Sequence, residues 1–168
     1  MEVEKVEEEY YQWELIKGQY YFENVHGITY ILSISDYSDV FKKRIQIDCI
    51  VYLLDIDNIN ETGGRSFKKH PKHKHDIKIS QTIIKILETN YKAIDKSFCG
   101  IYFTNEDGDD EGRQKTFKEW ADDLIEKDND YEFYDGSVTM DGEDGLGCLL
   151  IHKKNKDKDK LLECFDFH

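Results

Sequence analysis

The sequence predicts an α+β protein in which a meander of antiparallel strands precedes two helices and a closing pair of strands. Three observations indicate this class. β-Branched and aromatic residues recur between turn signals in the N-terminal third, apolar residues recur at helical spacing in two later segments, and the strands come in a run before the helices. The chain has 168 residues, of which 39% are hydrophobic and 13% aromatic. We therefore expect a single domain, 1–168, with a real hydrophobic core.

Turn signals divide the N-terminal third into four expected strands. Gly18-Gln19 separates the first two, and the Asn24-Val25-His26-Gly27 turn separates the second and third. The expected strands are 11–15, 20–23, 28–34 and 45–53. Because each is rich in β-branched or aromatic residues, they predict antiparallel pairing. Residues 1–9 are mostly acidic and are expected to form a frayed tail.

The middle of the chain predicts a long connection followed by a helix. Residues 57–75 are polar and end in a basic run, so we expect a polar and basic loop. Apolar residues from Ile77 to Tyr91 recur at helical spacing, and Asp76 is a suitable N-cap.

The remaining elements alternate before the chain ends in an extension. We expect a strand at 98–103, a helix at 113–125 with one apolar face, and two strands at 131–138 and 146–152 around a turn rich in Gly and Asp. Residues 153–168 are expected to be a C-terminal extension, with 153–160 as a solvated linker and 161–167 as a short element.

This order of elements is similar to the later part of the general N-acetyltransferase fold, over about residues 20–152. In that family, an Arg/Gln-x-x-Gly-x-Gly/Ala loop at the start of the central helix cradles the pyrophosphate of acetyl-coenzyme A with backbone amides. The matching segment here replaces the glycines with Asp76, Lys78 and Ser80. Their side chains block close backbone approach, and Asp76 repels phosphate. The resemblance therefore implies an acetyltransferase-like fold with a degenerate coenzyme A loop.

A second resemblance is to a family of small bacterial proteins with no established activity. Members have a D-x-x-I-x-x-T-I helix start and a later D-G-R-Q…F-x-x-W stretch. The similar residues here run from Asp76 to Ile83, and from Glu111 through Arg113 to Phe117 and Trp120. This resemblance implies no particular chemistry.

Charge is strongly segregated along the chain. The net charge is −13, and residues 106–144 hold 16 Asp and Glu against four Arg and Lys. Such a protein repels nucleic acid but can associate rapidly with a basic protein surface. The expected docking residues are Glu106, Asp107, Asp109, Asp110, Glu111 and Arg113. The simpler interpretations are that the acids confer solubility and that Arg113 pairs with neighbouring carboxylates.

Two segments have some features of metal sites. Asp107 to Gly112 is similar to the start of a calcium loop, but the closing position holds Lys118 in place of a bidentate Glu. His70, His73 and His75 form the densest histidine cluster, without a clear further ligand. We therefore expect no metal and no cofactor.

The sequence carries no signature of a familiar catalytic site, such as a P-loop, a nucleophile elbow or an HExxH helix. Phe117 and Trp120 are spaced as core residues. The cysteines are Cys49, Cys99, Cys148 and Cys164, widely spaced and mostly within apolar runs. With no apparent leader or membrane span, these features predict a reduced, cytoplasmic protein that binds no membrane.

Three functions fit these observations. The first is a non-catalytic acidic module that binds a basic protein, for example as an inhibitor or immunity-type protein. The second is a divergent acetyl-coenzyme A-dependent N-acyltransferase, in which Tyr134 or a carboxylate near 132–135 serves as acid or base. The third is a DNA mimic, whose carboxylates replace phosphates and occupy a nucleic-acid-binding protein.

Overall fold

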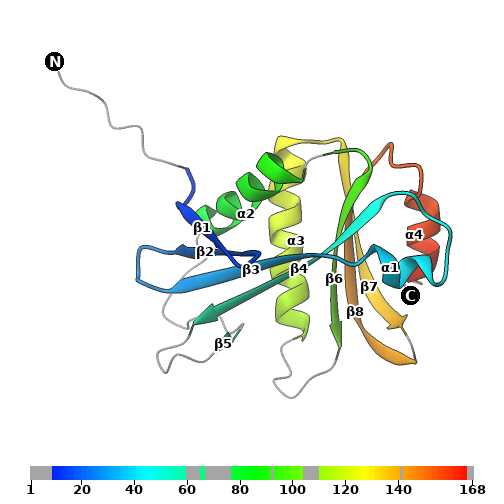
Figure 1. The fold of residues 1–168 in the computed structure, drawn as a ribbon, viewed down its shortest axis with the longest axis horizontal. Coiled ribbons are helices and arrows are strands. Elements are labelled where there is room, and N and C mark those ends of the chain that lie inside the picture. The colour runs from blue at the N-terminus through cyan, green and yellow to red at the C-terminus, as the bar shows by residue number, and fades with distance from the viewer. Residues whose placement is uncertain are drawn as a thin grey trace.

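Eight strands form one mixed sheet with helices on both of its faces, which confirms the α+β class (Figure 1). The computed structural model describes residues 9–59, 65–66, 77–91, 93–103, 110–140 and 142–165. The strands are β1 (Trp13–Ile16), β2 (Gln19–Glu23), β3 (Thr29–Asp36), β4 (Ile50–Ile59), β5 (Arg65–Ser66), β6 (Lys96–Phe103), β7 (Tyr131–Met140) and β8 (Glu143–His152). The helices are α1 (Ser38–Lys42), α2 (Ile77–Asn90), α3 (Asp110–Lys127) and α4 (Lys158–Phe165).

The sheet has the order β1-β2-β3-β4-β6-β8-β7, with β5 paired to β4 off this path. The first four strands are antiparallel, as the sequence predicts. β4 and β6 are the parallel pair, joined by a crossover that contains α2. A hairpin of β7 and β8 completes the sheet, with β8 between β6 and β7.

Two hydrophobic clusters lie on opposite faces of this sheet. On one face α2 and α3 pack over the strands, and we call this the α2–α3 face. Its buried residues include Leu54, Leu87, Phe98, Phe117 and Leu150. On the other, the α1–α4 face, the buried residues include Phe41, Val51, Cys99, Leu161 and Phe165. Figure 1 shows α3 on one side of β6, β8 and β7 and α1 with α4 on the other.

Residues 35–49 differ from the prediction. The expected strand 45–53 begins only at Ile50, and the unpredicted helix α1 precedes it. The Asp36 carboxylate accepts a hydrogen bond from the Ser38 amide at 3.0 Å, and the Ser38 hydroxyl accepts one from the Val51 amide at 2.9 Å. These local contacts fix a helical turn where the residue pattern indicates none.

The C-terminal segment is part of the core. Asn155 and Asp157, expected to be solvated linker residues, are buried, and α4 buries Leu161 and Phe165. The apolar spacing of residues 161–165 is helical, so α4 seals the α1–α4 face. None of the helices in the described ranges is long and apolar enough to cross a membrane.

Candidate functional site

The parallel pair β4 and β6 separates after four residues. Their ladder runs from Ile50 opposite Lys96 to Leu53 opposite Cys99, although β4 continues to Ile59 and β6 to Phe103. Beyond this point β4 still pairs with β3, and β6 still pairs with β8. The two strands therefore enclose a wedge that widens toward their carboxyl ends, and we call it the β4–β6 wedge.

The short strand β5 lies at the mouth of this wedge. Asn58 pairs with Tyr30 of β3 and also with Ser66 of β5. Because a strand has two edges, β5 must occupy the edge of β4 that faces β6. The β6-facing edge of Leu54, Asp55 and Ile56 lies between these two pairings and has no strand partner among the described residues.

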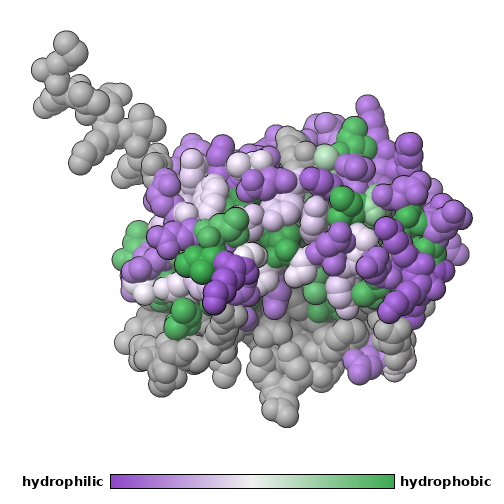
Figure 2. Space-filling view, viewed as in Figure 1, coloured by the Kyte–Doolittle hydropathy of each residue, from purple (hydrophilic) through white to green (hydrophobic). Residues whose placement is uncertain are grey.

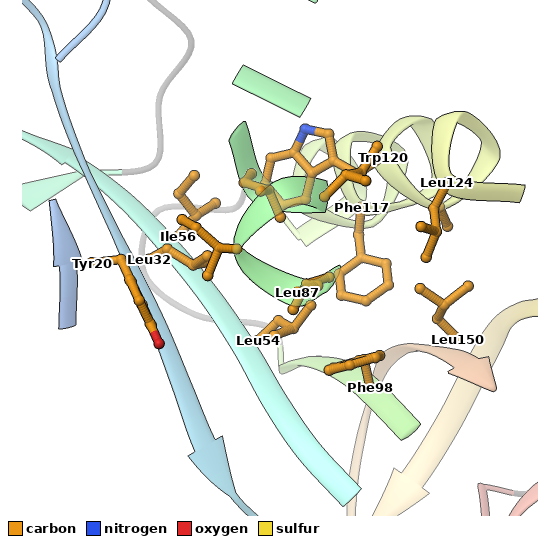
Figure 3. Packing of buried hydrophobic residues seen from close by; sticks show 14 of the residues in the cluster. Tyr20, Leu32, Leu54, Ile56, Leu87, Phe98, Phe117, Trp120, Leu124 and Leu150 are labelled. Carbon is orange, nitrogen blue, oxygen red and sulfur yellow. The ribbon is translucent and has the colours of Figure 1, made fainter. Parts of the chain in front are cut away.

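Aromatic and aliphatic side chains fill the α2–α3 side of the wedge. Figure 3 shows Phe117 and Trp120 of α3 with Leu87 of α2 above Leu54 and Phe98. The cavity that these side chains leave is only about 10 Å³, room for at most one water molecule. Among the described residues, the space beneath the helices is therefore a packed core.

The first turns of α2 are engaged by the protein's own side chains. The buried Ser80 hydroxyl lies 2.7 Å from Asp123 Oδ2 of α3 and 3.0 Å from the Ile77 carbonyl oxygen. The Thr82 hydroxyl accepts a hydrogen bond from the Tyr11 amide at 2.8 Å. A carboxylate beside the helix start is unfavourable for a phosphate group, which carries the same charge sign.

Only some of the predicted docking residues belong to the described part of the chain. Glu106, Asp107 and Asp109 fall outside the described residues. Asp110, Glu111 and Arg113 lie in the first turn of α3, and their side chains are likewise not described. The calcium-like segment and the histidines at 70, 73 and 75 also fall wholly or largely outside. Among the described residues no group of His, Cys, Asp or Glu could hold a metal ion.

Exposed carboxylates lie along α3 and the β7–β8 hairpin. Phe103, the last residue of β6, pairs with Gly145, so the chain leaves β6 next to the exposed Glu143 and Asp144 of the β7–β8 hairpin. We define the acidic α3–β8 surface by the exposed carboxylates of α3, the following turn, β7 and β8. They are Asp122, Glu126, Asp130, Asp135, Glu143 and Asp144. Exposed lysines among residues 115–137 and 142–144 are Lys115, Lys118 and Lys127, so the surface is net acidic.

Basic residues gather beside α1 and α4, the helices of the α1–α4 face. Lys42, Lys43 and Arg44 line a shallow hollow of about 470 Å³ after α1, and Lys160 of α4 donates a hydrogen bond to the Gln46 carbonyl at 2.9 Å. Hydrophilic side chains gather at the right-hand end of Figure 2, where Figure 1 places α1 and α4. Asp48 and Asp159 are interspersed there, so this surface is mixed in charge.

Tyr134, the candidate acid or base, lies on the α1–α4 face. It packs beside that hydrophobic cluster, and its hydroxyl donates a hydrogen bond to Glu132, which Lys158 also contacts at 3.1 Å. The hydrogen bond to Glu132, and then burial, raise the pKa of Tyr134 to about 12. Hydrogen bonds from Tyr134 and Lys158 hold the pKa of Glu132 below its usual range. Because α2 covers the other face, this pair and the α2 start do not form one site.

Asp157 forms a buried polar junction between the C-terminal segment and β4. Its carboxylate accepts hydrogen bonds from the Asp48 and Cys49 amides, both at 2.9 Å. Burial alone raises the pKa of Asp157, but the two amides outweigh it and the pKa is lowered. Burial, and then the Asp157 charge, raise the pKa of the Cys49 thiol to about 11. Cys49 is therefore protonated at neutral pH and is a poor nucleophile.

Local sequence patterns predict neither the β4–β6 wedge nor the Asp157 junction. Both depend on which segments become neighbours, and Gly100, the first residue of β6 beyond its ladder with β4, is a visible local signal of the wedge. In comparisons with known proteins, no family model matches the chain and no curated protein matches it significantly.

Proposed function

We propose that this protein is a non-catalytic module that binds a basic protein surface through its acidic α3–β8 surface, in the manner of an inhibitor or immunity-type protein. The observation that carries the proposal is the excess of exposed carboxylates over exposed lysines along α3, β7 and β8, from Asp122 on the helix to Glu143 and Asp144 at the hairpin. The acids expected at 106–111 follow β6 directly and would extend this surface.

Electrostatics favours a basic partner. Complementary charge accelerates the encounter of two proteins and disfavours partners of like charge. An enzyme or effector with a cationic active surface is a suitable target, because an acidic module that covers it competes directly with an anionic substrate.

The test is affinity capture with two charge-matched variants. In the first, Asp135, Glu143 and Asp144 are changed to Lys. In the second, the exposed Glu9, Glu14 and Glu23 at the N-terminal side of the sheet are changed to Lys, which gives the same change in net charge. We expect a specific partner that is captured at low salt by the wild type and the second variant and is lost in the first.

Equal capture by the two variants contradicts the proposal, as does capture that returns no specific partner. Excess duplex DNA is added in a further arm. If DNA displaces the protein from the partner, the partner is a nucleic-acid-binding protein and the protein acts as a DNA mimic.

One observation favours a second function, an acetyl-coenzyme A-dependent N-acyltransferase. β4 and β6 have no common ladder beyond Leu53 among the described residues, and an extended cofactor arm between two such strands would hydrogen-bond to their main chains. Asp123 beside the α2 start and the position of Tyr134 on the other face count against this function. A thermal melt with acetyl-coenzyme A tests it, because a ligand that binds the native state raises the melting temperature. An unchanged melting temperature at millimolar cofactor rejects it.

A further inference from the structure

Two half-buried tyrosines meet at the end of α2, on the α2–α3 face of the sheet. Tyr52 of β4 and Tyr91, which follows α2, have ring centroids 5.0 Å apart and ring planes at 78°. The hydroxyls of Tyr91 and the buried Tyr20 are hydrogen-bonded to each other at 3.0 Å, and the Tyr52 ring stacks beside Phe98. The core therefore holds both rings in place, while part of each ring's residue remains exposed.

Two exposed carboxylates flank Tyr52. Asp36 is its direct partner in the β3–β4 ladder, so the two side chains project from the same face of the sheet. Asp95 directly precedes β6, and its carbonyl accepts a hydrogen bond from the Ile50 amide of β4 at 2.8 Å. Burial, and then the charges of Asp36 and Asp95, raise the pKa of Tyr52. We call Tyr52, Tyr91, Asp36 and Asp95 together the Tyr52–Tyr91 surface.

The combination of aromatic rings and carboxylates indicates the chemistry of a ligand. The faces of tyrosine rings attract cations, as Lys78 shows with its Nζ 4.8 Å from the centroid of the Tyr11 ring. A guanidinium group is planar, stacks on such rings and donates two parallel hydrogen bonds to a carboxylate. Hydrogen bonds from Ser38 lower the pKa of Asp36, so this carboxylate is ionised and ready to accept them. Arginine is therefore the side chain that uses both the rings and the acids.

We propose that the Tyr52–Tyr91 surface binds the guanidinium group of an arginine side chain, which packs against the tyrosine rings and donates hydrogen bonds to the flanking carboxylates. That this arginine belongs to the basic protein partner rests on the proposed function. Arginine is enriched at protein interfaces, and a partner attracted by the acidic α3–β8 surface carries such side chains. Binding of the guanidinium group itself does not depend on the partner.

The probe is acetylarginine amide, and its control is acetylcitrulline amide, in which a neutral urea of the same shape replaces the guanidinium group. Binding is followed by NMR of the full chain with ¹³C-labelled tyrosine rings. We expect the ring resonances of Tyr52 and Tyr91 to shift and saturate with the arginine compound, and the citrulline compound to bind at least about fivefold more weakly. Choline, a cation without an N–H donor, is expected to bind more weakly than arginine as well.

The first pair of variants tests the rings. Tyr52→Leu and Tyr30→Leu each remove a half-buried tyrosine ring that packs against the α2–α3 cluster. We expect Tyr52→Leu to weaken binding of acetylarginine amide about tenfold, observed at the Tyr91 ring, and Tyr30→Leu to leave it within about twofold. A thermal melt of each variant verifies folding.

The second pair tests the carboxylates with an equal change in net charge. One double variant combines Asp36→Asn with Asp95→Asn, and the other combines Asp39→Asn with Asp159→Asn, all at exposed positions. Asparagine at position 36 keeps an acceptor for the Ser38 amide, so α1 retains its local contact. We expect the first double variant to weaken binding about fivefold and the second to leave it within about twofold.

Three outcomes overturn the proposal: equal binding of the arginine and citrulline compounds, equal effects of the two ring variants, or equal effects of the two charge variants. Choline binding as tight as arginine overturns the assignment to a guanidinium group. If partner capture depends on Asp135, Glu143 and Asp144 but not on Tyr52, the proposed function stands and the arginine is not the partner's. If acetylarginine amide binds as expected but no partner is captured, the proposed function fails and the guanidinium site stands.

Discussion

The two faces of the sheet are held together in different ways. The α2–α3 face is covered by helices of 14 and 18 residues, which pack aromatic rings such as Phe117 onto the strands. The α1–α4 face is covered by helices of five and eight residues. Isolated helices of that length are unstable in water, so their stability must come from tertiary contacts. On this face, buried side chains that bind the backbone, above all Asp157, supply such contacts.

β4 and β6 contribute residues to both clusters, on either side of the point where the two strands separate. Val51, Leu53 and Cys99, in the paired half of β4 and β6, pack with the α1–α4 cluster. Leu54 and Ile56, where the strands separate, belong to the α2–α3 cluster. Tyr52 and Phe98 of the same paired half pack on the α2–α3 face, and Ile101 of the separated half packs on the α1–α4 face, because successive residues of a strand point to opposite faces. The two faces therefore differ in the helices that cover them and not in where the strands separate.

The largest expected effect comes from truncating one ring on each face. Phe41 is fully buried, and its ring centroid lies 5.2 Å from that of Phe165. Phe41→Ala and Phe117→Ala should each lower the free energy of unfolding by about 3–5 kcal/mol, because each leaves a cavity. Native-state hydrogen exchange separates the two: Phe41→Ala should deprotect α4 selectively, and Phe117→Ala should deprotect α2 and α3. Identical exchange patterns would show that the two faces unfold as one unit.

The next largest effect concerns the Asp157 junction. Asp157→Ala leaves the buried Cys49 amide and the Asp48 amide without their acceptor, which should cost about 2–4 kcal/mol in urea unfolding. Asp159→Ala is the control, because Asp159 is exposed in the first turn of α4. If the two variants lose the same stability, side-chain contacts to the backbone do not hold the α1–α4 face.

The pH dependence of stability tests the same Asp157 junction. Because the pKa of Asp157 is lowered in the folded protein, its contribution to stability is present above the pKa of the unfolded chain. That contribution is lost as the pH falls through the lower, folded value. Between pH 7 and pH 2.5 we therefore expect Asp157→Asn to lose less stability than the wild type in urea unfolding. Parallel losses in the two proteins would contradict the assignment.

A smaller effect is expected at Thr82 on the α2–α3 face. Its hydroxyl joins the N-terminal segment to α2 by accepting the hydrogen bond of the buried Tyr11 amide. Thr82→Val should cost about 1–2 kcal/mol, the usual cost of an unpaired buried donor. The exposed Thr89 donates its hydrogen bond within α2, to the Lys85 carbonyl, so Thr89→Val should cost less than about 0.5 kcal/mol. Thermal denaturation of both variants compares them.

The smallest effect is expected at Tyr134. Its raised pKa means that stability is full below the pKa of an ordinary tyrosine and declines as the pH rises toward about 12. The pKa values of Tyr52 and Tyr91 are also raised, so absorbance titration should show several late-ionising tyrosines, of which Glu132→Gln moves one to lower pH. Tyr134→Phe should remove that titration and cost about 0.5–1 kcal/mol at pH 7. A titration unchanged in Glu132→Gln would show that this carboxylate is not the cause.

Local patterns predicted most of the fold but little of the candidate site. The apolar spacing of Ile83, Ile84 and Leu87 predicts α2 correctly, and the spacing of Phe117, Trp120 and Leu124 predicts α3, because each follows the 3.6-residue period. Strand 45–53 was predicted five residues too long at its start, because Ile45 and Ile47 alternate as a strand does. These residues pack on the α1–α4 face while Asp157 binds the amides that follow them.

The candidate site depends on relations between distant segments. The β4–β6 wedge arises from a ladder that stops at Leu53, and no single-residue pattern in β4 marks that stop. The charge of the acidic α3–β8 surface was visible in the sequence, but the proximity of Glu143 and Asp144 to the end of β6 required the pairing of Phe103 with Gly145. Composition predicts the charge of a surface, whereas strand pairing determines its shape.

The Asp157 junction also constrains how the chain folds during synthesis. The carboxylate binds amides 109 and 108 positions earlier in the sequence, so this contact has very high contact order. While a ribosome makes the chain, β4 and β6 emerge long before residue 157, and their α1–α4 side stays exposed until α4 follows. Val51, Cys99 and Leu149 form an apolar surface during that interval. Nascent chains are thus expected to engage chaperones until the last helix is released, and slow translation after β8 should prolong that engagement.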